Sequence, residues 1–208
     1  MLPPATMLPI AAPWLDYAGL SVFAVSGALA AARREQTLVT LAFFALVTGV
    51  GGGTVRDLLI DAPVFWVRDP HVAGLCLGMA LIVWATPTRW WRGQALDWFD
   101  AVGLAAYAVY GAAKALRFGV PPVPAVLMGV VTACVGGIIR DVLAGEPSIL
   151  MRPELYVTAA ALSSGSYVAL TALGLPGVVA AGIAAAGFGL RAAAIRWKLA
   201  LPAYTPRN

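Results

Sequence analysis

The sequence predicts an all-α integral membrane protein with seven transmembrane helices, arranged as a three-plus-three inverted repeat followed by a seventh helix. The first observation is composition: of 208 residues, 61% are hydrophobic and 12% are charged, roughly half the charged fraction of an ordinary soluble domain. The second is that the charges cluster between long apolar runs, as in helices that cross a bilayer. The third is that the chain matches itself at a constant offset of 84 residues.

Each predicted helix follows from an uncharged stretch, since about 20 apolar residues cross a hydrocarbon core of roughly 30 Å. The first five stretches cover, in order, residues 17–32, 36–55, 72–88, 101–113 and 118–139. A sixth, residues 155–190, is too long for one helix and contains Gly and Pro at 173–177, so we divide it in two. The predicted helices, within a single transmembrane domain of residues 1–208, are residues 15–33, 38–60, 71–87, 97–117, 122–144, 155–173 and 176–197.

The repeat relates residues 15–88 to residues 97–173 and matches residues that carry chemistry. The matched pairs include Asp16 with Asp100, Gly27 with Gly111, Arg33 with Arg117, Thr48 with Thr132, Arg56 with Arg140 and Asp57 with Asp141. Because each repeat holds three helices, the second copy enters the membrane from the opposite side. Inverted repeats of this kind place a solute pathway at their interface, near the midplane of the bilayer. Residues 176–197 lie outside the repeat, and we expect them to serve packing or oligomerisation.

Basic residues in the connections predict the orientation of the chain. If the N-terminus is outside, the outside connections hold three basic residues, Arg68, Lys114 and Arg117. The inside connections then hold nine, which are Arg33, Arg34, Arg89, Arg92, Arg152, Arg191, Arg196, Lys198 and Arg207. The positive-inside rule therefore favours an external N-terminus and a cytoplasmic C-terminus.

Two glycine motifs occupy equivalent places in the repeats: GVGGGTVRD at residues 49–57 and ACVGGIIRD at residues 133–141. Neither has the Gly-Lys pair of a P-loop, and neither completes a dinucleotide-binding fingerprint. In a membrane, consecutive glycines let another backbone approach closely. They could therefore serve only a tight helix crossing, or they could break the helix and line a wet pathway with freed carbonyls. The candidate pore and kink residues are Thr48, Gly49, Gly51, Gly52, Gly53, Thr132, Gly136 and Gly137.

Each motif ends in an Arg-Asp pair inside a predicted helix, Arg56–Asp57 and Arg140–Asp141. A charge at that depth costs at least ~2.5 kcal/mol on insertion scales, so it needs a partner or water. Neighbouring residues on a helix do not face each other, so we expect each pair to find partners outside its own motif. The inverted symmetry separates the two motifs across the membrane, so we expect no pairing between them. Two roles stay open for these charges, a rigid clamp between helices and direct contact with an ion.

The symmetry suggests where those partners lie. Asp16 begins the first predicted helix and Asp100 begins the fourth, each on the membrane face where one motif ends. We therefore predict that Asp16 neighbours Arg56 and that Asp100 neighbours Arg140.

Lys114 and Arg117 end the fourth predicted helix. They could extend to the lipid headgroups. Alternatively, they could form a mobile charge at the mouth of a pathway that responds to voltage or anionic lipid.

Several function classes are not expected from this sequence. It has no nucleophile–base pair and no metal-ligand spacing, so we expect neither an enzyme nor a cofactor. Its basic residues do not form the stripe that is typical of a nucleic-acid-binding surface, so we expect no nucleic-acid partner.

The seven helices, the inverted repeat and the paired motifs, Gly51 to Asp57 and Gly136 to Asp141, resemble the prokaryotic branch of the trimeric intracellular cation (TRIC) channel family. The resemblance covers essentially the whole chain. It implies a homotrimer in a plasma membrane, with a pore in each subunit and helices kinked at the glycine motifs. It also implies permeation by monovalent cations, with potassium favoured modestly over sodium, and contact with membrane lipids. Lys114 and Arg117 lie in positions similar to basic residues that eukaryotic members use for voltage sensing and lipid binding.

The sequence departs from the family in two places. Val135 stands in the second motif where Gly51 stands in the first, and the long basic tail of the eukaryotic members is absent.

Our preferred hypothesis is a potassium-permeable channel. The alternative is a secondary transporter of glycine or another small solute, since inverted repeats with broken helices also serve transporters. A purely structural membrane protein is the third alternative, and the charges within the helices argue against it.

Overall fold

The computed structural model describes residues 13–91, 93–151 and 154–202, except for the side chains of residues 13–16, 183 and 184. These residues form helices and no named strand, with one isolated β-bridge between Glu154 and Ala200. The α-helices are α1 (Pro13–Ala32), α2 (Leu38–Leu59), α3 (Pro70–Ala85), α4 (Ala95–Arg117), α5 (Pro122–Leu143), α6 (Val157–Ala172), α7 (Gly177–Ala184) and α8 (Ala186–Trp197). Three short 3₁₀ segments are η2 (Phe65–Val67), η3 (Thr88–Trp91) and η4 (Ile149–Met151).

The predicted helices agree with the structure, within a few residues, for the first six. The seventh expected span, residues 176–197, is present as Gly177–Trp197, with a single interruption at Ala185 that divides it into α7 and α8. There the Phe188 N–H donates to the Ala185 carbonyl at 2.9 Å, a tighter 3₁₀-type bond. Gly187, the second residue of α8, lies directly against Ser163 of α6, with no room for a larger side chain.

Most helices are apolar enough for a bilayer. Three stretches of 22, 22 and 21 residues, namely α2, α5 and α7 with α8, can cross a membrane by length and composition. α1, α3 and α6 are apolar but shorter. At 16 residues each, α3 and α6 are about 24 Å long. α4 is long enough but carries four charged residues, Asp97, Asp100, Lys114 and Arg117.

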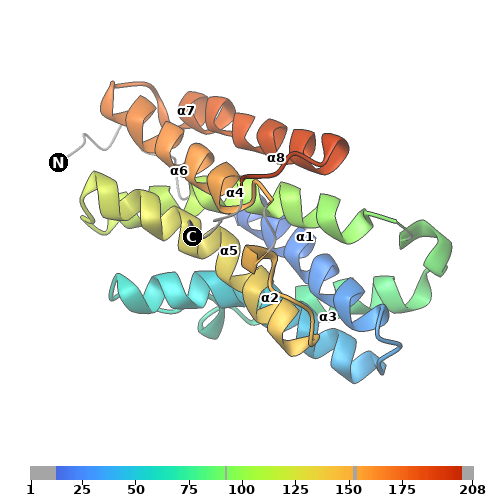
Figure 1. Cartoon of the computed structure of the whole chain (residues 1–208). Coiled ribbons are helices and arrows are strands. Elements are labelled where there is room, and N and C mark those ends of the chain that lie inside the picture. Colours follow the sequence, from blue (N-terminus) through green and yellow to red (C-terminus); the bar gives the residue numbers. More distant parts are fainter. Residues whose placement is uncertain (1–12, 92, 152–153, 203–208) are drawn as a thin grey trace, which may run out of the picture.

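The two repeats meet between α1 and α4 and between α2 and α5 (Figure 1). The rings of Phe23 and Tyr107, which are equivalent residues of the two copies, stack with centroids 5.3 Å apart. Gly19 lies against Tyr107, and its equivalent Gly103 lies against Phe23. Contacts between equivalent residues are what a twofold axis between α1 and α4 requires. The seventh span, α7 and α8, packs on α4 and α6.

Contacts between helix ends show that the second copy is inverted. Lys114, at the end of α4, lies 2.8 Å from Asp57, near the end of α2. Arg34, just after α1, contacts Glu146, just after α5. A second copy that entered from the same side would have placed α4 and α1 parallel, with these ends apart. The fold class predicted from the sequence is therefore confirmed.

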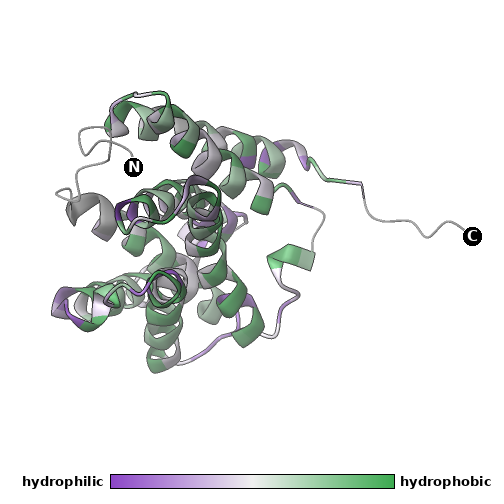
Figure 2. Cartoon of the chain, turned by 90° about the vertical axis from the view of Figure 1, so that its left-hand side faces the viewer, coloured by the Kyte–Doolittle hydropathy of each residue, from purple (hydrophilic) through white to green (hydrophobic). Residues whose placement is uncertain are grey.

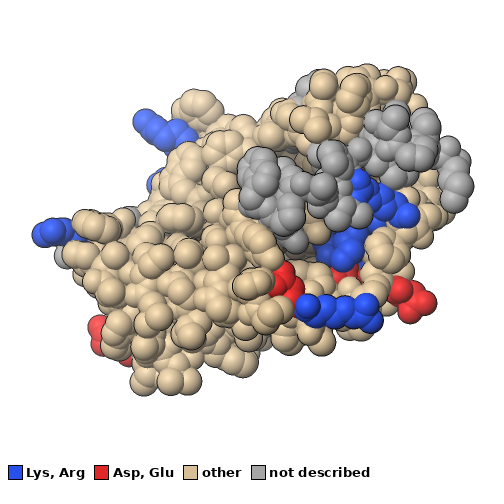
Figure 3. Space-filling view, turned by 180° about the vertical axis from the view of Figure 1, so that it is seen from behind, with Lys and Arg blue, Asp and Glu red and all other residues tan. Residues whose placement is uncertain are grey.

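The surface has the polarity of a membrane protein. Helices are hydrophobic over most of their length, and hydrophilic residues gather at the turns (Figure 2). Large apolar side chains face outward, including Val39, Phe43, Val123 and Leu127. Most of the face shown in Figure 3 is uncharged, and its Lys, Arg, Asp and Glu side chains gather in a group at and to the right of the centre and at the left margin. At one end, outside the spans, Tyr17 and the N–H of His71 donate hydrogen bonds to Asp69 and lower its pKa.

Candidate functional site

The glycine motifs form the crossing between α2 and α5. A Cβ on Gly52 would collide with the backbone oxygen of Thr132, and one on Gly136 would collide with the backbone oxygen of Thr48. These four residues are buried. Only glycine allows the two backbones to approach so closely.

Both helices stay α-helical across their motifs, from Leu38 to Leu59 and from Pro122 to Leu143. The described residues of α2 and α5 thus show a tight crossing and no helix break, and a pore-lining role of the glycines stays a prediction. Gly52 and Gly136 each lie against a backbone oxygen of the facing helix, so the two copies approach closely without any unwinding of α2 or α5. Gly49, Gly51, Gly53 and Gly137 are also helical, and they contact side chains from other helices.

Beyond the crossing lies a first-repeat site, defined as Arg56, Asp57, Phe65, Tyr110 and Lys114. Arg56 Nε donates to Asp57 Oδ1 at 2.9 Å, and Arg56 Nη2 is 2.8 Å from the same oxygen. Lys114 Nζ also lies 2.8 Å from Oδ1, while the Phe65 N–H donates to Asp57 Oδ2 at 3.1 Å. The Arg56 guanidinium lies over the Tyr110 ring, 5.2 Å from its centroid. One buried carboxylate thus faces two cations.

At the opposite end lies a second-repeat site, defined as Ser26, Asp100, Arg140, Asp141 and Ile149. Arg140 donates to Asp141 Oδ1 from Nε at 2.9 Å and from Nη2 at 2.8 Å. Its Nη1 donates to Asp100 Oδ1 and to Ser26 Oγ, each at 2.5 Å. The Ile149 N–H donates to Asp141 Oδ2 at 2.9 Å. Here one buried cation faces two carboxylates, the reverse of the first-repeat site.

The structure confirms one prediction about these charges and overturns another. Asp100 does contact Arg140. The expectation that neighbouring Arg and Asp do not pair is wrong for both motifs. The long arginine side chain folds back so that Nε and Nη2 together reach the adjacent carboxylate, and burial leaves few other partners. The predicted neighbourhood of Asp16 and Arg56 stays a prediction, because the Asp16 side chain lies outside the described residues.

Lys114 and Arg117 have different surroundings. The Lys114 side chain is 14% exposed and turns inward to Asp57. Its extension to lipid headgroups is therefore not what the structure shows, because the ammonium is held beside the buried Asp57 carboxylate. Arg117, one turn later, is half-buried. Voltage or lipid sensing by either residue stays a prediction.

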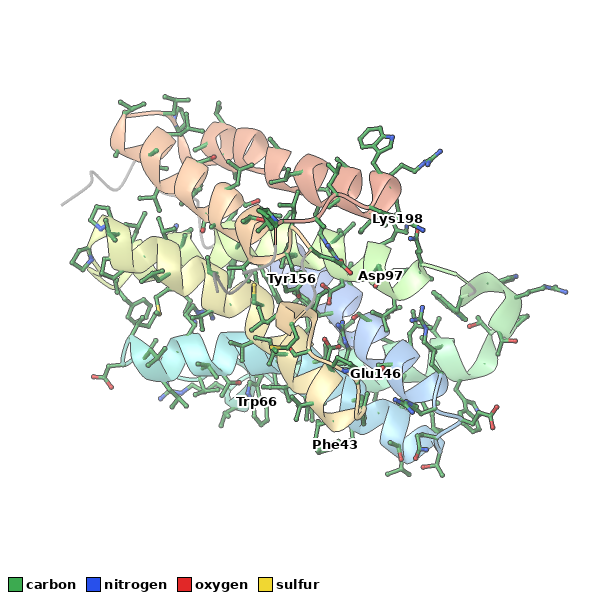
Figure 4. All side chains as sticks on the ribbon, viewed as in Figure 1. Phe43, Trp66, Asp97, Glu146, Tyr156 and Lys198 are labelled. Carbon is green, nitrogen blue, oxygen red and sulfur yellow. The ribbon has the colours of Figure 1, made fainter. Side chains whose placement is uncertain are left out.

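The repeats differ at the position of Lys114. Its equivalent on α1 is Ala30, which has no charge to place beside Asp141. A cavity of about 190 Å³ opens there instead, lined by Ala30, Arg33, Arg34, Leu96, Asp97, Arg140, Asp141, Ala144, Glu146 and Ile149. Asp97 and Glu146 lie toward this end of the bundle (Figure 4). An ammonium group thus fills the first-repeat site, whereas the second-repeat site borders a polar cavity.

Sequence reasoning missed Arg191. It was assigned to a connection, yet it is 1% exposed and forms an ion pair with Glu154 at 2.7 Å. Its place within the predicted helix 176–197 was the available indication of a buried charge. Ser26 was also missed, because a serine in an apolar helix is not distinctive. No group of three or more metal-binding side chains occurs in the described part of the chain.

At the mouth of the cavity, Arg34 and Glu146 form an ion pair with side chains 47% and 48% exposed. Replacing Arg34 with Ala is expected to lower the free energy of unfolding by less than about 1 kcal/mol, because water already screens this pair. The loss should shrink further in high salt. Unfolding titrations at two salt concentrations measure both effects, and a salt-independent loss above about 2 kcal/mol would contradict the prediction.

An inverted pair of three-helix units, with ion pairs buried at both ends of their crossing, defines a multi-pass membrane protein of the inverted-repeat class. A family model described as "Glycine transporter" matches the chain twice, at residues 13–88 and 97–172. The UPF0126 inner membrane protein YadS of Escherichia coli strain K12 is 40% identical over 92% of this chain and 95% of its own length. A UPF0126 membrane protein of Vibrio cholerae is 37% identical over 91% of this chain and 81% of its own length.

Solved structures of membrane channels are similar to this chain in fold and in sequence. The TRIC trimeric intracellular cation channel orthologue from Rhodobacter sphaeroides has a TM-score of 0.84 and 44% identity, covering 90% of this chain and 98% of that chain. A structure described as the basis for conductance through TRIC cation channels also has a TM-score of 0.84, at 28% identity, covering 96% of this chain and all of that chain. The chain belongs to this family of prokaryotic TRIC and UPF0126 membrane proteins.

Proposed function

We propose that this protein is a channel for monovalent cations, permeable to potassium and sodium. The pathway runs through each subunit of a homotrimer, between the two repeats. The observation that carries the proposal is the pair of buried charged sites at opposite ends of the α2–α5 crossing. Its support is the similarity to solved TRIC cation channels.

The charges suggest how such a pathway is controlled. Among the described side chains, the second-repeat site has two carboxylates for one guanidinium, which favours a cation. The first-repeat site has two cations for one carboxylate, which repels a cation while Lys114 sits on Asp57. Conduction then requires Lys114 to withdraw and expose Asp57. This assigns Lys114 the role of an electrostatic gate.

The glycine crossing forms the second barrier of the proposed pathway. With Gly52 and Gly136 against opposing backbone oxygens, no hydrated ion fits between the helices. Opening would separate α2 from α5 at this point. The residues exposed by that movement are the proposed pore lining, which are Thr48, Gly49, Gly51, Gly52, Gly53, Thr132, Gly136 and Gly137.

In the proposed placement the chain lies in a bacterial inner membrane, surrounded by lipid, with its N-terminus outside. Two basic residues must be removed from the comparison of the two sides, because Arg191 is buried and Lys114 is paired inside the protein. Arg191 belongs to the cytoplasmic side and Lys114 to the outside, so the cytoplasmic side still has more basic residues. The first-repeat site then faces outward and the second-repeat site faces the cytoplasm.

Planar bilayers containing the purified protein should show unitary currents carried by potassium. Lys114→Met should raise the open probability at zero voltage several-fold, because Asp57 loses the ammonium that covers it. Arg117→Gln is the control, since it removes a charge from the same helix end without uncovering Asp57. Verified incorporation with no current, or saturable glycine uptake in proteoliposomes without current, would contradict the channel. Equal gating in both variants would contradict the role of Lys114.

A further inference from the structure

The seventh span carries a buried arginine that neither repeat accounts for. Arg191 of α8 is 1% exposed, and its Nη1 lies 2.7 Å from Glu154 Oε2. Its guanidinium also lies over the Tyr156 ring, 5.3 Å from the centroid. Burying a charge is costly, and a helix that serves only packing has no need of one. Both partners of Arg191, Glu154 and Tyr156, belong to the segment that precedes α6.

Tyr156 lies between Arg191 and the second-repeat site and contacts both. The ring is buried in the core, 1% exposed. A Cβ placed on Gly137 would lie 2.8 Å from the Tyr156 hydroxyl oxygen and 3.3 Å from Asp100 Oδ1. The hydroxyl and the carboxylate thus share the space that the missing side chain of Gly137 leaves open. Asp100 Oδ1 is the same atom that accepts a hydrogen bond from Arg140.

The first repeat lacks this connection. The residues equivalent to Glu154 and Tyr156 are Pro70 and Val72, and Gly53, the equivalent of Gly137, contacts the ring of Phe65 instead. The difference follows from the fold, because the seventh span packs on α4 and α6 of the second repeat. The chain after α8 contributes as well, since Ala200 forms a backbone bridge with Glu154.

We infer that Arg191 is a positioning residue of the second-repeat site: it holds Tyr156 against Gly137 and so fixes the surroundings of Asp100 and Arg140. The seventh span thereby controls one end of the bundle. This contact network stands on its own geometry, and only its consequence for permeation rests on the proposed function.

Cys134 provides a reporter that does not depend on transport. It is 3% exposed, lies one turn before Gly137 on α5, and belongs to the same core cluster as Tyr156. In a Cys76→Ala background it is the single thiol of the chain. Arg191→Met should release Tyr156 and speed modification of Cys134 by a small methanethiosulfonate reagent by about tenfold. Arg191→Lys should restore most of the protection, because an ammonium group still pairs with Glu154.

Arg196→Met is the matched control, because Arg196 is an exposed arginine on the same helix. If Arg191→Met does not fold, Glu154→Gln takes its place and should give a smaller acceleration. Unchanged Cys134 rates, or an equal acceleration by Arg196→Met, would overturn the inference.

A second measurement separates positioning from a merely structural role. A variant that only folds less well has fewer active channels, whereas loss of positioning changes the unitary conductance of each one. Arg191→Met should therefore change unitary conductance, and Arg191→Lys should return it toward the wild-type value. An altered Cys134 rate in a protein that carries no current would support the positioning and reject the channel. An unaltered Cys134 rate in a protein that carries current would reject the positioning role of Arg191 and support the channel.

Discussion

Arg140→Met is expected to lower the free energy of unfolding by about 3–5 kcal/mol, because it leaves two buried carboxylates without their counter-ion. Arg140 is 1% exposed and contacts both Asp100 and Asp141. Methionine fills similar space, so the lost charge rather than a cavity should dominate. Reversible unfolding of the purified protein in mixed micelles, with increasing denaturing detergent, measures the difference.

The repeat supplies a matched control for this experiment. Arg56→Met removes the equivalent guanidinium, but Asp57 keeps the ammonium of Lys114 at 2.8 Å. The loss there should be at most about half as large. Asp100→Asn combined with Arg140→Met should recover part of the stability, because one fewer carboxylate is left uncompensated. Equal losses for Arg56→Met and Arg140→Met would show that the ion pairs do not decide the stability of either site.

Gly52→Ala is expected to have the second large effect, a loss of about 1–3 kcal/mol through overpacking at the α2–α5 crossing. Alanine normally stabilises a helix by up to about 1 kcal/mol relative to glycine. Here the added methyl group would collide with the backbone oxygen of Thr132, which no side-chain rotation can relieve. Gly136→Ala should behave alike, since it meets the backbone of Thr48. The same unfolding titration measures both variants.

Two other helical glycines serve as controls. A Cβ on Gly74 or Gly78 of α3 would meet nothing within 4 Å. Alanine at either position should therefore leave stability unchanged or raise it slightly. If all four alanine variants change stability by the same amount, the close approach at the crossing is not what requires glycine.

The helix positions and the inverted repeat could be predicted from the sequence, because the length of an apolar run and the constant offset are properties of the chain itself. The bounds of α2 and α5 follow directly from them. The contact of Asp100 with Arg140 was also predictable, since topology places the start of α4 beside the end of α5.

The remaining features depend on tertiary partners that no local pattern contains. Whether Lys114 extends to the headgroups or turns inward depends on Asp57, which lies on another helix. Whether the glycines break α2 or only allow α5 to approach it depends on how closely α5 packs against α2. Arg191 looked like an ordinary span-end charge because Glu154 and Tyr156 reach it only in the folded protein.

The replacement of Lys114 by Ala30 across the repeat has a consequence for how the molecule could evolve. In a dimer of two identical chains, any mutation alters both entrances at once. Once the two units are fused in one gene, a single codon can remodel one entrance and leave the other untouched. The lysine on one side and the small residue on the other are the kind of divergence that duplication followed by fusion permits.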